Sequence, residues 1–309
     1  MREILAATGS TDLLRRPFGS LLTAMVTPFT AAGEVDLDAA AALAAGLVDG
    51  GSDGLVVCGT AGEASTLEDQ EKEDLIRVVK ETVGNQASIV AGTGTNCTAR
   101  SISMARRAAR AGADGQLVVT PYYSKPTQAG VAEHFTRIAE ETDLPVMLYD
   151  IPGRAGIAIS TVTMKRLAEN ARIVALKDAK ADFSATTVVL AETDLAVYAG
   201  DDALALPWLA AGASGLVSVS AHAAPGAFRQ LVDAVHCGNL ALARRLHFEL
   251  APLVRAVMDH IPAATAAKHI LHRQQRLAGS FVRSPLTEPT GSEARNLAAE
   301  VAGTAWALN

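Results

Sequence analysis

From about Leu21 to His222, short apolar runs rich in Val, Leu and Ile alternate with longer amphipathic segments. Each run follows a Gly, Pro or polar break and has the length of one buried strand. Uninterrupted apolar runs are typical of parallel strands that helices cover on both sides. About eight of them occur, which is the number that closes a (β/α)8 barrel. We therefore predict an α/β fold with a (β/α)8 barrel.

The runs expected to be strands read LLTAMVTPF, GLVVCGT, SIVAGTG, GQLVVTP, PVMLYDIP, RIVALKDA, AVYAGD and GLVSVSAH. Segments between them, such as TLEDQEKEDLIRVVKETVG starting at Thr66, have the periodicity of amphipathic helices. An open doubly wound sheet also alternates strands and helices, but it usually carries a Gly-rich phosphate loop after the first strand. Here the first strand ends in Thr27, Pro28 and Phe29, so the closed barrel is favoured.

Beyond about Pro225 the apolar periodicity continues without further strand signals, so the tail is predicted to be helical. We divide the chain into an N-terminal extension (residues 1–18), the barrel (19–224), and the last barrel helix with a C-terminal helical extension (225–309). The extension is not expected to be a separate domain.

Composition and charge point to a compact protein with small-molecule partners. Hydrophobic residues make up 49% of the 309 residues and charged residues 19%, which suits a large core and not a disordered chain. A formal net charge of -6 gives no electrostatic reason to bind nucleic acid or an anionic membrane.

The three cysteines, Cys58, Cys97 and Cys237, are widely spaced and form no CxxC pair. This spacing favours buried reduced thiols over a disulfide framework or a zinc site, and we expect no metal. Charged residues interrupt the N-terminal segment, and no run of about 18 apolar residues occurs, so we expect a cytoplasmic protein without a signal peptide.

Active sites of (β/α)8 barrels lie at the carboxyl ends of the strands, so polar residues that end an apolar run are the candidates for chemistry. They are Thr60, Tyr122, Tyr123, Tyr149, Asp150, Lys177 and Asp201. Lys177 follows Ala175 and Leu176, and a low-dielectric site disfavours its charged form. A neutral amine attacks carbonyl carbon, and the iminium it forms is an electron sink for making or breaking C–C bonds. The alternatives are that Lys177 forms an ion pair with Asp178 or that its amine reaches solvent.

Two further strand ends suit this chemistry. Tyr149 ends the neighbouring fifth strand, where its phenol can carry protons to and from an adduct of Lys177, although a structural tyrosine with a hydrogen-bonded hydroxyl is the alternative. The turn from Gly59 to Glu63 presents backbone amides that can bind a carboxylate, and the Thr60 hydroxyl can relay protons. A single glycine-flanked turn is weak evidence of a site.

Four motifs, CGTAGEASTL, VTPYYSKP, YDIPGR and VALKDAKAD, occur in this order, each at a predicted strand end. From about Gly19 to its C-terminus the chain thereby resembles the dihydrodipicolinate synthase and N-acetylneuraminate lyase superfamily, and most closely the actinobacterial dihydrodipicolinate synthases. The resemblance implies a class I, Schiff-base-forming lyase that condenses pyruvate with L-aspartate 4-semialdehyde in lysine and diaminopimelate biosynthesis. It also implies a homotetramer built as a dimer of dimers.

By this resemblance Lys177 is the Schiff-base lysine, Tyr149 the central proton carrier, and Thr60 and Tyr123 its partners in a relay. In the family the tyrosine that matches Tyr123 comes from a neighbouring subunit. The substrate-binding positions are Ala61, Arg154, Gly200 and Val217. Arg154 matches the arginine that binds the semialdehyde carboxylate, which suits the two-donor geometry of guanidinium. No cofactor is implied, since the iminium is the electron sink.

Ala61 departs from the family pattern, in which a second threonine follows Thr60 and helps to hold the pyruvate carboxylate. This change implies either weaker pyruvate binding or a larger 2-oxo acid as substrate. A related aldolase or dehydratase-aldolase and a barrel that binds without turnover therefore stay open. Asp69, Lys72 and Arg100 also stand where family members that bind the inhibitor lysine carry imidazoles and a carboxylate, which implies weak or absent inhibition by lysine.

Overall fold

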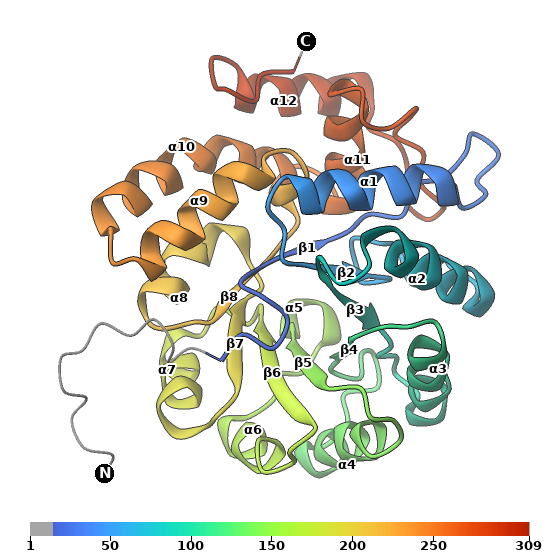
Figure 1. The fold of residues 1–309 in the computed structure, drawn as a ribbon, viewed down its shortest axis with the longest axis vertical. Coiled ribbons are helices and arrows are strands. Elements are labelled where there is room, and N and C mark those ends of the chain that lie inside the picture. Colours follow the sequence, from blue (N-terminus) through green and yellow to red (C-terminus); the bar gives the residue numbers. More distant parts are fainter. Residues whose placement is uncertain (1–14, 309) are drawn as a thin grey trace.

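The computed structural model describes residues 15–308 of the chain. Within them a closed parallel barrel contains the strands in sequence order, which confirms the predicted (β/α)8 fold (Figure 1). The strands are β1 (Leu21–Ala24), β2 (Gly54–Val57), β3 (Ser88–Gly92), β4 (Gly115–Val119), β5 (Val146–Asp150), β6 (Ile173–Asp178), β7 (Ala196–Ala199) and β8 (Gly215–Ser218).

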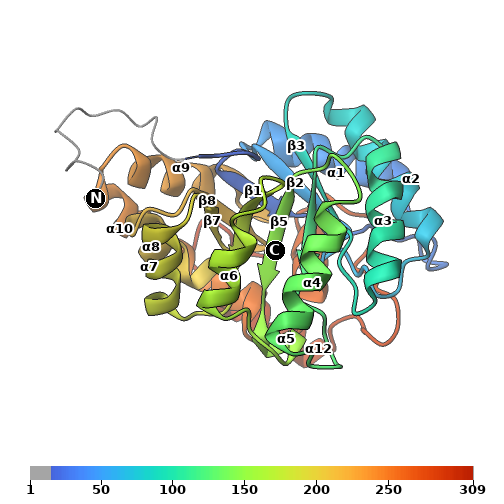
Figure 2. The same ribbon diagram turned by 90° about the horizontal axis from the view of Figure 1, so that it is seen from below.

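Helices surround the barrel on its outer side (Figure 2). They are α1 (Leu37–Asp49), α2 (Asp69–Val83), α3 (Thr98–Arg110), α4 (Gln128–Ala139), α5 (Pro152–Ala155), α6 (Thr161–Leu167), α7 (Phe183–Glu192), α8 (Ala205–Ala210) and α9 (Pro225–His236), with 3₁₀ turns η2 (Asp202–Leu204) and η3 (Ser220–His222). Helix α2 begins at Asp69, later than the predicted start at Thr66. The Thr66 hydroxyl donates to Glu63 O at 3.0 Å, and the helix is capped instead by Glu68 with Glu71.

After α9 the chain continues as α10 (Leu240–Met258), α11 (Ala263–Arg273) and α12 (Gly291–Val301). Figure 1 shows these helices gathered on one side of the barrel, next to α9 and α1. The tail is therefore helical, as its periodicity predicts. The boundaries at residues 18 and 224 remain an interpretation, and residues 1–14 of the N-terminal extension lie outside the described residues.

The sheet closes where β1 pairs in parallel with β8, with Leu22 opposite Val217. A buried imidazole holds the chain just beyond this seam. His222 Nε2 accepts a hydrogen bond from Val26 N at 3.0 Å, and Nδ1 lies 2.7 Å from Val219 O. Because one nitrogen must accept and the other donate, the two contacts together require a neutral ring.

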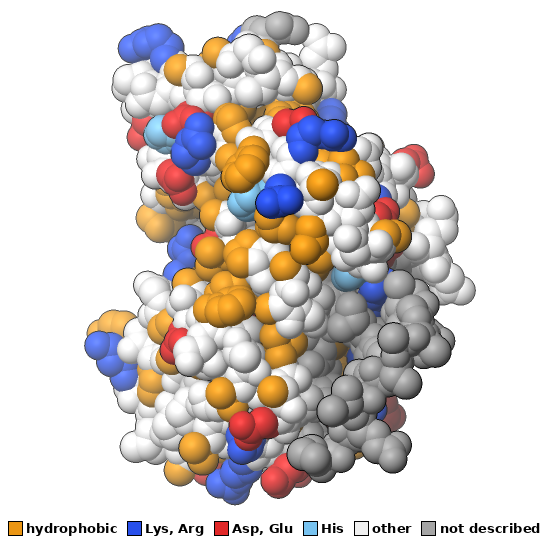
Figure 3. Space-filling view, turned by 90° about the vertical axis from the view of Figure 1, so that its left-hand side faces the viewer, with side chains coloured by type: hydrophobic (Ala, Val, Ile, Leu, Met, Phe, Trp, Pro, Cys, Tyr) orange, Lys and Arg blue, Asp and Glu red, His pale blue; other side chains and the backbone are white. Residues whose placement is uncertain are grey.

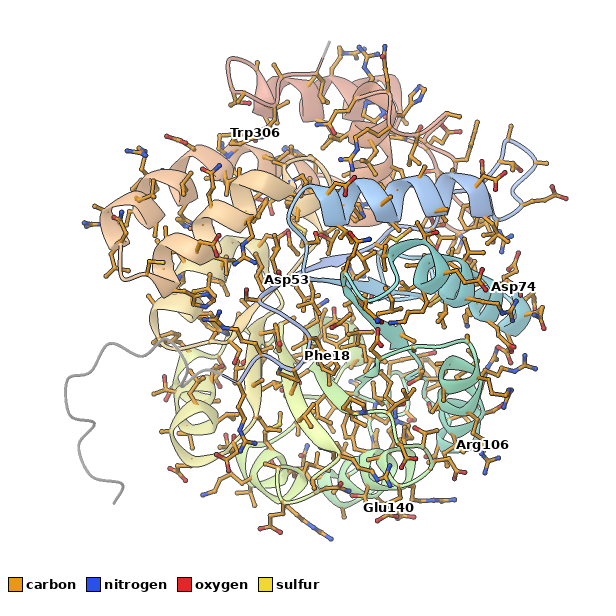
Figure 4. All side chains as sticks on the ribbon, in the orientation of Figure 1. Phe18, Asp53, Asp74, Arg106, Glu140 and Trp306 are labelled. Atoms are coloured by element: carbon orange, nitrogen blue, oxygen red, sulfur yellow. The ribbon has the colours of Figure 1, made fainter. Side chains whose placement is uncertain are left out.

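The opposite, amino-terminal end of the barrel is filled by Phe18, which lies within the ring of strands (Figure 4). Gly115 is required there, because a Cβ at this position would lie 2.3 Å from the Phe18 ring. The Tyr198 hydroxyl donates to Gly19 O at 2.9 Å and fixes the segment that enters β1. With this end closed, only the carboxyl ends of the strands are left to form a site.

Apolar side chains lie between charged ones on the face that includes α7, α8 and α10 (Figure 3). Phe183 on α7 and Leu240 and Phe248 on α10 are its large exposed apolar residues. Among residues 15–308, no helix combines the length and the hydropathy needed to cross a bilayer. The cytoplasmic location expected from the sequence stays a prediction.

Replacing His222 should change how stability depends on pH. Burial lowers the pKa of His222 from 6.5 to about 4, so the unfolded chain takes up a proton at a higher pH than the folded one. The stability that the neutral ring contributes is complete above about pH 6.5 and is lost as the pH falls toward 4. We expect His222→Gln to be less stable than the wild type at pH 7.5, and the gap to shrink by up to about 3 kcal/mol near pH 4.5. Urea unfolding across this range measures it, and a constant gap would contradict it.

Candidate active site

A cavity of about 300 Å³ lies at the carboxyl ends of the strands. The strand ends contribute Thr60, Tyr149, Lys177 and Gly200 to its wall. The opposite wall comes from the C-terminal region, through Met258, Pro262, Ala263, Ala264, Pro285 and Leu286. These last residues belong to no motif, so no sequence pattern predicts their place in the site. The helical extension therefore forms part of the site.

Lys177 and Tyr149 face each other across the pair β5 and β6, where they are register partners. The Lys177 ammonium lies 4.3 Å from the centre of the Tyr149 ring, and Lys177 is only 5% exposed. Its ammonium forms no hydrogen bond or ion pair with any other described residue. The neighbouring Asp178 is engaged elsewhere, because its carboxylate accepts hydrogen bonds from Lys180 N and the Thr186 hydroxyl. The amine is thus buried, free and directed at the cavity.

Gly200, which follows β7, makes room for this lysine. A Cβ at Gly200 would lie 3.0 Å from Lys177 Cγ and 2.8 Å from Asp178 O. Any larger residue would therefore push against the lysine stem or the backbone of β6. This contact explains why glycine stands at a position that the sequence analysis assigned to substrate binding.

The turn after β2 carries Thr60 and Ala61 into the cavity. Cys58 and Glu63, at its two ends, have positive φ angles of 58° and 54°, and Thr60 O accepts a hydrogen bond from Glu63 N at 3.1 Å. The Ala61 side chain is buried against the barrel core. Within residues 15–308 the Thr60 hydroxyl makes no hydrogen bond to the Tyr149 phenol, so the two groups share a cavity without forming a relay in the single chain.

A buried ion pair lies behind this turn. Lys268 on α11 binds the Glu63 carboxylate and donates to Phe281 O at 2.8 Å, and its ammonium lies 4.0 Å from the centre of the Phe29 ring. Arg283 N donates to Glu63 Oε2 at 2.9 Å. Burial lowers the pKa of Lys268, while the Glu63 carboxylate opposes that effect. The C-terminal region thereby holds the turn in place with a charge that no sequence motif predicts.

Only some of the other expected site residues line this cavity. Arg154, on α5, is exposed and lines it, and so does Asp201, whose carboxylate caps η2 through Ala203 N. Tyr123 is 90% exposed, has a φ of 74°, and does not line the cavity. Val217 is buried in the barrel core, and Val219 takes the place on the cavity wall.

No group of three or more His, Cys, Asp or Glu side chains within residues 15–308 is arranged to hold a metal ion.

Comparison with known proteins gives consistent matches over nearly the whole chain. Residues 17–303 match the profile described as the Dihydrodipicolinate synthetase family. A 4-hydroxy-tetrahydrodipicolinate synthase of Kineococcus radiotolerans is 54% identical over 287 residues, which are 93% of each chain. The solved structure of dihydrodipicolinate synthase DapA-2 from Bacillus anthracis superimposes with a TM-score of 0.89 at 40% identity, covering 92% of this chain and 97% of that one.

A second solved structure bears on the ligand. It is described as the chloride-inhibited dihydrodipicolinate synthase from Acinetobacter baumannii complexed with pyruvate. It superimposes with a TM-score of 0.88 at 34% identity, over 93% of this chain and 98% of that one.

Removing one partner of the buried pair should destabilise the protein far more than removing both. Lys268→Met leaves the Glu63 carboxylate buried without its counter-charge, and we expect a loss of about 3–5 kcal/mol in the free energy of unfolding. The double variant Glu63→Gln/Lys268→Met should recover most of that loss. Lys165→Met removes a lysine from the exposed pair with Glu192 and should cost at most about 1 kcal/mol. Urea denaturation compares the variants, and additive losses in the double variant would refute the coupling.

Proposed function

The chain belongs to the dihydrodipicolinate synthetase family, and we propose that it is a class I lyase that condenses pyruvate with L-aspartate 4-semialdehyde to 4-hydroxy-tetrahydrodipicolinate. The reaction is a step of lysine and diaminopimelate biosynthesis. The observation that carries this proposal is the buried Lys177 amine, free of a counter-ion and directed at the cavity beside the Tyr149 ring.

In the proposed mechanism Lys177 Nζ adds to the ketone carbon of pyruvate, and loss of water leaves an iminium. A proton then leaves the methyl carbon, and the electron pair of that C–H bond forms an enamine. The enamine carbon bonds to the aldehyde carbon of the second substrate, whose oxygen takes up a proton. The amino group of the second substrate finally displaces Lys177 from the iminium carbon and closes the ring. The iminium is the only electron sink required, so the mechanism needs no metal or organic cofactor.

Tyr149 is the proposed proton carrier for these steps. Its ring lies against the Lys177 ammonium, so a proton passed through its hydroxyl has a short path to the carbinolamine. We assign Thr60 and Tyr123 to a relay that connects this hydroxyl with solvent. Thr60 lines the cavity, which supports its part.

Arg154 is the proposed ligand of the semialdehyde carboxylate. Arg154 lines the cavity from α5, and its planar two-donor guanidinium suits a carboxylate. The Gly59–Glu63 turn, with Ala61, and the strand-end positions Gly200 and Val217 are assigned to the pyruvate end of the site.

We further propose a homotetramer, built as a dimer of dimers, in which Tyr123 enters the site of a neighbouring subunit. Two features of Tyr123 support this assignment: it is 90% exposed, and its backbone has a φ of 74°, a conformation that is strained for a residue other than glycine. A large aromatic residue that is exposed in the single chain suits insertion into another chain.

Reductive trapping tests the reaction class. With pyruvate and borohydride, we expect the wild type to gain one reduced pyruvyl group per chain on the peptide that contains Lys177, because the reduced iminium no longer hydrolyses. Lys177→Ala should show no gain in intact mass. Lys180→Ala is a matched control, since Lys180 lies nearby in an ion pair with Asp150 at 3.6 Å and should leave trapping intact.

Trapping also separates the competing functions. An adduct with pyruvate, followed by turnover with aspartate semialdehyde, supports the proposal. An adduct with a longer 2-oxo acid such as 2-oxobutyrate but not with pyruvate points to a related aldolase or dehydratase-aldolase. Absence of any adduct would favour a barrel that binds without turnover.

Restoring a hydroxyl at position 61 should strengthen pyruvate binding. Ala61 is buried beside the catalytic pair, so a threonine there can donate to the pyruvate carboxylate. One hydrogen bond to a charged group corresponds to roughly a ten- to hundredfold change in binding. We expect Ala61→Thr to lower KM for pyruvate by about this factor, whereas Ala61→Val, with the same shape and no hydroxyl, should give no gain. Steady-state kinetics with both substrates measures this. If both variants instead lose activity toward a longer 2-oxo acid, the space at Ala61 serves a larger substrate.

A further inference from the structure

Glu63 ends the turn after β2 that carries Thr60 and Ala61 to the active-site cavity. Its backbone has a φ of 54°, a conformation that is strained for a residue other than glycine. Its carboxylate is bound by the C-terminal region, because Lys268 donates to one oxygen and Arg283 N to the other. None of the proposed steps of the reaction uses this carboxylate.

Both partners of the Glu63 carboxylate lie next to residues of the opposite cavity wall. Lys268 follows Ala264 by four residues in α11, which is about one helical turn. Arg283 comes shortly before Pro285 and Leu286, which line the cavity. One carboxylate therefore connects the turn on one side of the cavity with the two segments that form the other side.

Arg283 fixes the segment that follows it through further contacts. Its guanidinium donates to Gly33 O at 2.8 Å and to Thr66 O at 2.9 Å. It also donates through two N–H groups to the Glu71 carboxylate, at 2.7 and 2.6 Å, and lies 4.5 Å from the centre of the Phe29 ring. A guanidinium held by this many directed contacts leaves its segment little freedom to move relative to α2 and the turn.

Net stability alone is a weak reason for such a pair. The side chains of Glu63 and Lys268 are each 1% exposed, and apolar residues of similar volume often stabilise a core as well as a buried ion pair does. What the pair supplies is a fixed direction and distance. A turn whose amides bind a substrate carboxylate needs this, because a misplacement of about 1 Å can cost a hundredfold in rate.

We propose that Glu63 is a positioning residue that holds the turn with Thr60 and Ala61 at a fixed distance from the C-terminal wall, and that this spacing sets the affinity of the site for its 2-oxo acid. The identity of that ligand rests on the proposed function. Because both oxygens of the Glu63 carboxylate are engaged by Lys268 and Arg283, Glu63 acts through the turn and not as an acid or base in the reaction.

Steady-state kinetics on the full-length variant Glu63→Gln/Lys268→Met tests the proposal. This variant removes both buried charges and should stay folded, which circular dichroism checks. We expect KM for pyruvate to rise by about tenfold or more and kcat to fall by less than about threefold, since Lys177 and Tyr149 are unchanged. Glu63→Asp keeps the charge and shortens its reach, so its KM should lie between those of the wild type and the double variant.

The matched control is Arg229→Met. Arg229 on α9 pairs with Asp53, which directly precedes β2 and so lies at the amino-terminal end of the barrel. Its loss can lower stability, as a change at Glu63 can, but it lies at the end of the barrel opposite the turn. We expect this variant to keep the wild-type KM for pyruvate.

Hydrogen exchange on the free protein gives a readout that needs no activity. Glu63 N and Ala64 N donate within the turn, to Thr60 O and Gly59 O. Amides of residues 59–66 should therefore exchange faster in the double variant than in the wild type, whereas amides of α4 should not. In Arg229→Met the turn should exchange at the wild-type rate.

Two results would overturn the proposal. One is a lower kcat at unchanged KM, because a purely structural role reduces only the fraction of active enzyme. The other is equal exchange of the turn in the wild type and the double variant. If the wild type traps no 2-oxo acid, the proposed function and the effect on affinity fail together, but faster exchange in the double variant would still show that Glu63 holds the turn. The two failures are therefore distinguishable.

Discussion

The parallel pairing of β1 with β8 is the constraint on which the rest of the structure depends. Once the sheet closes, the carboxyl ends of all strands meet at one mouth, and residues far apart in the chain become neighbours. Thr60, Tyr149 and Lys177 share a cavity for this reason. The neutral His222 ring reinforces the closure just above the seam, so the same few contacts hold the barrel shut and bring the site together.

The barrel and the neighbouring positions of Tyr149 and Lys177 can be predicted from the sequence, because local periodicity determines both. Apolar runs give the strands, and the polar residue that ends each run lies at the mouth. Tyr149 and Lys177 were expected side by side because they end consecutive strands, and the register of β5 with β6 confirms that neighbourhood. Their catalytic roles are a separate matter and remain proposals.

Other parts of the site depend on tertiary contacts that no periodicity encodes. Lys268 reaches Glu63 across 205 residues, and neither lies in a pattern that relates it to the other. Lys72 reads in the sequence as one charge of an amphipathic helix, and only the structure shows that it is buried. The relay from Thr60 to Tyr149 was inferred by resemblance, and the single chain leaves the Thr60 hydroxyl without that hydrogen bond.

The long separation between Glu63 and its counter-charge sets an order of events during synthesis. Chains emerge from the ribosome with the N-terminal part first, at about 5–20 residues per second. The turn after β2 can therefore begin to fold well before Lys268 and Arg283 have been translated. Until they arrive, burying Glu63 leaves a carboxylate without compensation, which favours a solvated turn. A nascent chain that ends before α11 contains the residues of all the described strands but lacks Lys268 and Arg283, and it therefore lacks the contacts that hold the turn after β2 at the mouth of the barrel.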